Sequence, residues 1–171
     1  MAGPRRAESK DEGALKGALK GARILVVEGR YYEAIADALL AGAQRALEAA
    51  HVDYDVVTVP GALEIPQAIA LALDGAAKRK AGYDGAVALG CVIRGETSHY
   101  DIVAGESARA LMALGIDRGV PVGNGILTVD KEDQARVRAD PDGQDKGGTA
   151  VRAALALARL KRSLTRPRGR R

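Results

Sequence analysis

With 171 residues, the chain can form one compact domain but not two of ordinary size. A single cysteine excludes an internal disulfide, and no apolar run is long enough to span a bilayer, so we expect a cytoplasmic protein with no membrane partner. The net charge of +4 lies at the two ends: the last eleven residues contribute +6 and the first twenty +2, which leaves residues 21–160 at −4 and argues against a nucleic-acid partner.

In chain order, the pattern predicts a mobile N-terminal extension (1–20), one domain (21–164) and a basic C-terminal tail (165–171). Short apolar runs predict strands at 23–29, 52–59, 84–93 and 120–129. Helical periodicity predicts helices at 32–49, 63–78, 98–114, 131–139 and 148–162. Because apolar strands alternate with helices, we expect a three-layer α/β/α sandwich with a four-stranded parallel sheet, of flavodoxin-like kind.

Ligands of such sheets bind at the carboxyl ends of the strands. The chain segments predicted at these ends are EGRYYEA, TVPGALEIP, GCVIRGETSHYD and GNGILTVDKED. They combine glycines, prolines and polar side chains in an unusual way, so we expect the functional site there.

The third segment carries His99, one of only two histidines. Gly95 allows the backbone to approach a ligand, and Thr97 and Ser98 can cap the following helix, whose free N–H groups favour an anion. Glu96 would repel a phosphate unless its side chain faces solvent. A histidine here fits proton transfer, although a capping loop with a surface histidine explains this segment equally well.

The other segments offer further candidates, each with an ordinary alternative. In the second, Pro66 is tolerated only in a first helical turn, so Glu64 lies where it can either accept hydrogen bonds from a ligand or favour the helix dipole. Tyr31 can stack on a ring or be a half-buried loop tyrosine. Arg138 and Lys146 can hold an oxyanion or be surface charges.

Several mechanisms lack their motifs in this sequence. There is no Walker-type phosphate loop, no G-x-G-x-x-G after the first strand, no paired-cysteine metal site and no HExxH. Cys91 lies within a predicted strand and is expected to pack as a small apolar group rather than act as a nucleophile. Neither an ATPase nor a metalloenzyme is indicated.

Together, the stretches VPGALEIP, GCVIRGETSHYDIV, PVGNGILTV and DKGGTAVRAAL resemble the lumazine synthase family, in order from about Arg23 to Leu164. The resemblance implies an enzyme, a transferase of riboflavin biosynthesis without metal or other cofactor. Its small-molecule substrates would be 5-amino-6-ribitylaminouracil and 3,4-dihydroxy-2-butanone 4-phosphate, joined with loss of phosphate and water. It further implies a homopentamer with sites between subunits, and leaves open whether twelve pentamers form a 60-subunit shell.

The resemblance also implies roles for individual residues. His99 would be catalytic and shuttle protons. The substrate-binding residues would be Tyr31, Ala62, Leu63, Glu64, Cys91, Val92, Ile93 and Asn124. The phosphate-binding residues would be Gly95, Glu96, Thr97, Arg138 and Lys146. Of these residues, Asn124, Arg138 and Lys146 would come from one subunit and the rest from its neighbour.

The chain departs from the family pattern at three places. Asn124 and Leu63 replace common site aromatics, and the loop before Lys146, DPDGQD, lacks the lysine- and glycine-rich pattern of shell-forming members. These departures permit an alternative, a flavin-binding or regulatory paralogue with little turnover. The presence of His99, Arg138 and Lys146 favours the enzyme.

Overall fold

The structure, a computed structural model, describes residues 19–79 and 81–165. The expected N-terminal extension and C-terminal tail therefore fall almost entirely outside the described residues. The first of these, Leu19, is buried, and its carbonyl accepts a 2.8 Å hydrogen bond from the Ala22 N–H, which turns the chain into the first strand. No helix in the described part is both long and apolar enough to cross a membrane.

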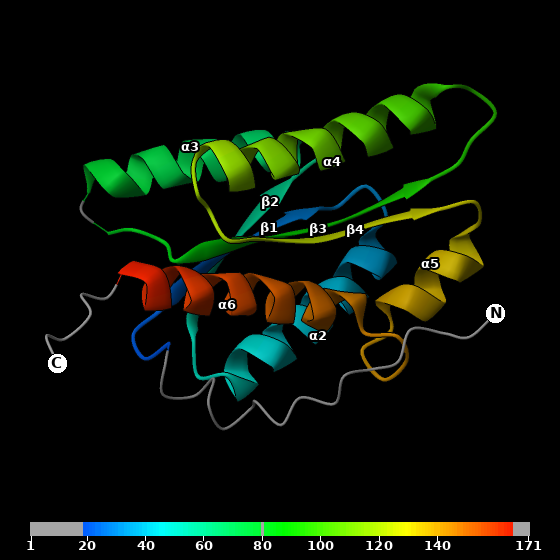
Figure 1. The fold of residues 1–171 in the computed structure, drawn as a ribbon. Coiled ribbons are helices and arrows are strands. Elements are labelled where there is room, and N and C mark those ends of the chain that lie inside the picture. Colours follow the sequence, from blue (N-terminus) through cyan, green and yellow to red (C-terminus); the bar gives the residue numbers. More distant parts are fainter. Residues whose placement is uncertain (1–18, 80, 166–171) are drawn as a thin grey trace, which may run out of the picture.

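A four-stranded sheet forms the middle layer (Figure 1). Its strands are β1 (Arg23–Gly29), β2 (Asp53–Val59), β3 (Gly85–Ile93) and β4 (Val122–Val129). All pairings are parallel, in the order β2-β1-β3-β4. The α/β fold predicted from the sequence is therefore confirmed.

Helices cover both faces of this sheet. α3 (Glu64–Lys78) and α4 (His99–Asp117) lie on one face, and α2 (Glu33–Ala49), α5 (Glu132–Ala139) and α6 (Lys146–Thr165) lie on the other (Figure 1). The central strands β1 and β3 are buried along nearly their whole length, whereas the edge strand β2 alternates between exposed and half-buried residues. A core covered on both sides explains why the central strands read as continuous apolar runs.

The last helix begins two residues earlier than predicted, at Lys146 instead of Gly148. Asp145 caps it: Oδ1 accepts a 3.0 Å hydrogen bond from the Gly148 N–H, and the Asp145 carbonyl accepts one of 2.9 Å from the Thr149 N–H. Lys146 and Gly147, which the pattern placed before the helix, lie in its first turn. Aspartate is among the preferred N-cap residues, so Asp145 was the overlooked signal.

Candidate active site

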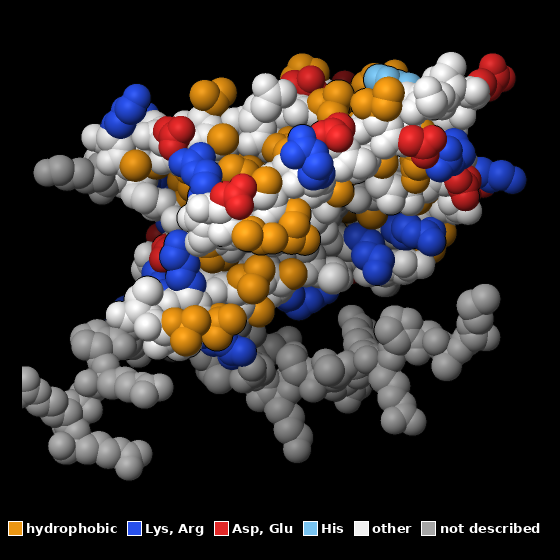
Figure 2. All heavy atoms as spheres, turned by 45° about the horizontal axis from the view of Figure 1, so that its top comes forward, with side chains coloured by type: hydrophobic (Ala, Val, Ile, Leu, Met, Phe, Trp, Pro, Cys, Tyr) orange, Lys and Arg blue, Asp and Glu red, His pale blue; other side chains and the backbone are white. Residues whose placement is uncertain are grey.

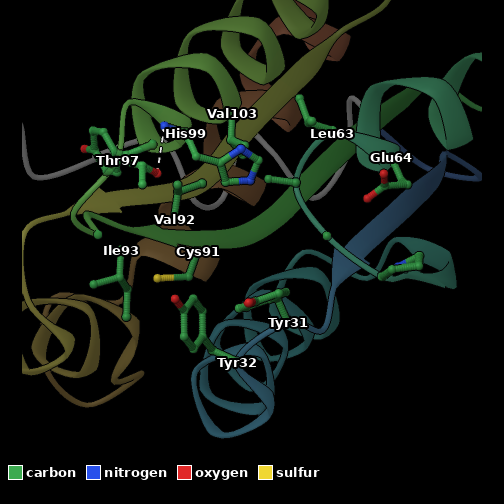
Figure 3. Close-up of a pocket in the computed structure, with 15 residues that line it drawn as sticks. Tyr31, Tyr32, Leu63, Glu64, Cys91, Val92, Ile93, Thr97, His99 and Val103 are labelled. Atoms are coloured by element: carbon green, nitrogen blue, oxygen red, sulfur yellow. Dashed lines mark hydrogen bonds between the residues drawn. The ribbon is translucent and has the colours of Figure 1, made fainter.

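A cavity of about 510 Å³ opens at the carboxyl ends of β1, β2 and β3 (Figure 3). Three loops meet there, as expected for a parallel sheet. The cavity is lined by Tyr31, Tyr32, Pro60, Gly61, Ala62, Leu63, Glu64, Cys91, Val92, Ile93, Gly95, Thr97, His99, Tyr100 and Val103. It therefore brings together ten of the fourteen residues that the sequence singled out.

Two tyrosines follow β1 and form the aromatic side of the cavity. Tyr31 is 75% exposed, and its ring meets that of Tyr32 edge to face, with centroids 4.9 Å apart. Tyr32 is half-buried, and burial raises the pKa of its hydroxyl, which therefore stays protonated at neutral pH. Tyr31 thus offers an accessible ring face, and the neighbouring Tyr32 ring packs against it.

The loop after β2 packs directly against the end of β1. A Cβ atom on Gly29 would lie 3.0 Å from the carbonyl carbon of Gly61, so a larger residue would push the two loops apart. This approach brings Ala62, Leu63 and the N-terminus of α3 beside the tyrosines. Glu64 is the first residue of α3 and is exposed, with its carboxylate on the cavity side (Figure 3).

His99 is the first residue of α4, and its ring extends into the cavity near Val92 and Val103 (Figure 3). The expected cap is formed differently: Ser98 makes no side-chain capping hydrogen bond, and Thr97 Oγ1 accepts a long one of 3.4 Å from the His99 N–H. Gly95 and Thr97 line the cavity, whereas Glu96 is exposed and does not. Within the described part of the chain, the His99 N–H at the positive end of α4 is therefore only weakly hydrogen-bonded.

The end of β3 forms the floor. Cys91 and Val92 are buried, and Ile93 is half-buried. Burial raises the pKa of the Cys91 thiol to about 12, so this group is a neutral part of the wall at physiological pH. An apolar floor with a histidine and a carboxylate at the rim suits a flat heterocycle that carries a polar chain.

Three other predicted residues lie away from this cavity. In the sheet register Asn124 pairs with Ala88, whereas Cys91 pairs with Leu127, so Asn124 sits three residues, roughly 10 Å, before the cavity floor. Arg138 is on α5, where Nη1 donates a 2.9 Å hydrogen bond to the Gln134 carbonyl, and Lys146 begins α6. Among the residues that the structure describes, no lysine or arginine lines the cavity.

Tyr32, Tyr100 and Val103 also line the cavity, and the sequence reasoning missed them. Each is one to four residues from a predicted site residue, and Val103 follows His99 at the i, i+4 spacing that puts two residues on one helix face. That spacing was the available signal for Val103. For Tyr32 and Tyr100, only adjacency to Tyr31 and His99 pointed to the site.

The comparisons with known proteins agree with this geometry. Residues 21–162 match the family model described as 6,7-dimethyl-8-ribityllumazine synthase. Proteins with that name are similar over most of the chain. The protein from Methylobacterium radiotolerans is 66% identical over 145 residues, 85% of each chain. That from Xanthobacter autotrophicus is 58% identical over 93% of this chain and 96% of its own, and that from Afipia carboxidovorans is 54% identical over 98% and 100%. A match of this extent and identity, over a fold whose loops meet in one cavity, means that the chain belongs to the 6,7-dimethyl-8-ribityllumazine synthase family.

Proposed function

We propose that the protein condenses 5-amino-6-ribitylaminouracil with 3,4-dihydroxy-2-butanone 4-phosphate to 6,7-dimethyl-8-ribityllumazine, as an enzyme of riboflavin biosynthesis. The observation that carries this proposal is the cavity itself. It joins an exposed tyrosine ring, a carboxylate, a histidine and a helix N-terminus at one edge of the sheet. No observation favours the alternative of a paralogue that binds flavin without turnover.

Each part of the cavity suits one part of the two substrates. Tyr31 stacks on the pyrimidine ring. The Glu64 carboxylate accepts hydrogen bonds from the ribityl hydroxyls, and the Ala62 backbone N–H donates one to them. Gly95 and Thr97 receive the phosphate at the N-terminus of α4. The two substrates are then held side by side over the apolar floor, which supplies much of the rate enhancement.

The reaction needs protons to move at each step but needs no strong nucleophile from the protein. The primary amine of the pyrimidine attacks the ketone, and loss of a first water gives an imine. Phosphate then leaves by elimination, and the second nitrogen attacks the carbonyl group that results and closes the ring with loss of a second water. His99 extends into the cavity, and its imidazole can both accept and donate a proton, so it carries protons between these steps.

The phosphate requires positive charge that the cavity lacks. A phosphate dianion in a cavity that no lysine or arginine of the described residues lines would be poorly stabilised. We propose that a second copy of the chain supplies Arg138 and Lys146, and that its Asn124 also faces the neighbouring site. The complete site therefore forms between subunits, in a homopentamer.

The surface supports such an assembly. Hydrophobic side chains gather on the face of α4 and α6 in Figure 2, and a groove of about 600 Å³ runs between these helices and the start of β4. Met112, Ile116 and Leu160 line it and are 63%, 72% and 52% exposed. An apolar groove of this kind is typical of an interface, and Asn124 lies at its margin.

The direct test follows product absorbance with both substrates for the wild type, His99→Ala and Arg138→Ala. We expect ready turnover in the wild type and a fall of about 10-fold or more in each variant. Arg136→Ala is the control for the same helix, because its ion pair with Glu132 is exposed and does not line the cavity. His51→Asn is the control for the second histidine, since asparagine tolerates its φ of 53°. A wild type that binds flavin and forms no product above background would contradict the proposal.

A further inference from the structure

Arg94 is the first residue after β3, where the chain leaves the sheet for the loop that contains Gly95 and Thr97. Its N–H donates a 2.9 Å hydrogen bond to the Val129 carbonyl, which extends the pairing of β3 with β4 by one residue. The backbone of Arg94 is thus held by the sheet, while its side chain reaches toward α4.

The Arg94 guanidinium joins three groups on two other segments. Nη2 and Nη1 lie 3.1 and 3.5 Å from the two carboxylate oxygens of Asp101, in the first turn of α4. Nε lies 3.3 Å from Oδ1 of Asp130, directly after β4. The guanidinium carbon lies 4.0 Å from the centroid of the Tyr100 ring. Only arginine provides a planar fork that can pair with a carboxylate and stack on a ring together.

Two of these contacts, those with Tyr100 and Asp101, are made to the turn that carries His99. Tyr100 and Asp101 are the next two residues after His99, and both His99 and Tyr100 line the cavity. The turn has weak capping of its own, since Ser98 provides no side-chain cap and the hydrogen bond from the His99 N–H to Thr97 is long. Isolated exposed ion pairs contribute little to stability, but one side chain that makes several contacts at once can order a segment of the chain.

We propose that Arg94 is a positioning residue, whose guanidinium ties the first turn of α4 to the end of β4 and thereby fixes the His99 ring over the cavity. The catalytic part of this inference rests on the proposed function. The structural part does not, so the two can fail separately.

The structural part is tested by hydrogen exchange, followed by mass spectrometry on peptides covering residues 94–103. The Asp101 and Ile102 N–H groups donate to the Ser98 carbonyl at 3.0 and 3.4 Å and report on the first turn. In Arg94→Ala we expect their exchange to accelerate by about 10-fold or more, because local opening becomes easier. Arg109→Ala is the matched control: its ion pair with Glu106, 2.6 Å long, lies further along α4 and outside the cavity. We expect Arg109→Ala to leave the exchange rate of the peptides covering residues 94–103 unchanged.

The catalytic part is tested by steady-state kinetics of the same variants. In Arg94→Ala we expect kcat to fall about 10-fold or more, since displacements of about 1 Å cost that much or more. The KM for the pyrimidine should stay within about twofold, because its contacts come from other loops. Arg94→Lys keeps the charge but loses the fork and the flat stacking surface, so it should remain impaired.

Several results would overturn the inference. Unchanged exchange and kcat in Arg94→Ala, as in Arg109→Ala, would show that the contacts order nothing. Faster exchange with an unchanged kcat would refute the positioning role. A higher KM for the phosphate substrate alone, or full recovery in Arg94→Lys, would instead make Arg94 a simple charge for the phosphate. A wild type without turnover would refute the proposed function. The exchange result alone would then show whether Arg94 orders the first turn of α4.

Discussion

At the scale of single residues, Cys91 shows how burial decides the chemistry of a side chain. Its thiol lies in the cavity floor, and burial raises its pKa to about 12. Because only the thiolate reacts with alkylating reagents, we expect iodoacetamide at pH 8 to label the native protein at least about 100-fold more slowly than the chain in denaturant. Mass spectrometry of the single cysteine measures both rates.

Cys91→Ser provides the blank for this experiment, since it should show no thiol labelling in either state. Equal rates for native and denatured wild type would mean that the thiol is accessible and that its pKa is not raised by the fold. The sequence favoured a packing role because Cys91 lies within an apolar run, but only the structure shows that one side of this strand end faces a cavity.

At the scale of elements, the start of α6 depends on glycine. A Cβ atom on Gly147 would clash with the Leu39 carbonyl of α2 and would lie 3.2 Å from the Ala43 nitrogen. Gly147→Ala should therefore lower the free energy of unfolding by about 1–3 kcal/mol, because the two helices must move apart. Urea unfolding at fixed protein concentration measures the change.

Gly105→Ala is the matched control within α4, where an added Cβ meets nothing within 4 Å. Here the better helix propensity of alanine should raise the free energy of unfolding by up to about 1 kcal/mol. If both variants were stabilised alike, the close packing of α2 on α6 would not constrain position 147. Such contacts between distant helices leave no trace in local sequence patterns, which is why the sequence placed Gly147 before the helix instead of within it.

At the scale of the whole molecule, the proposed site between subunits of a pentameric ring predicts complementation. His99→Ala and Arg138→Ala chains, denatured together and refolded as a 1:1 mixture, should recover roughly a quarter of wild-type activity, because each ring interface pairs one half-site from each neighbour at random. Product formation by the mixture, compared with each variant alone, measures the recovery.

A mixture of His99→Ala and Tyr31→Ala chains is the control. Both residues line the same cavity of one chain, so no interface would regain a complete site. If mixed assemblies form but the first mixture performs no better than this control, the site does not draw Arg138 from a neighbouring chain.

The sequence by itself determined the elements and the edge of the sheet where the site forms. Short apolar runs such as residues 23–29 and 84–93, alternating with helical patterns, indicate buried parallel strands. The carboxyl ends of such strands meet at one edge, which predicts that the loops around Tyr31, Glu64 and His99 come together.

The tertiary structure decided the rest, because it depends on distances between elements. Three features join segments whose local sequence patterns are independent of one another. They are the strand order β2-β1-β3-β4, the contact of Arg94 with Asp101 and Asp130, and the close packing of Gly147 in α6 on α2. The same holds for the residues outside the cavity. Arg138 and Asn124 follow ordinary helix and strand patterns, and only the sheet register and the packing of α5 separate them from His99.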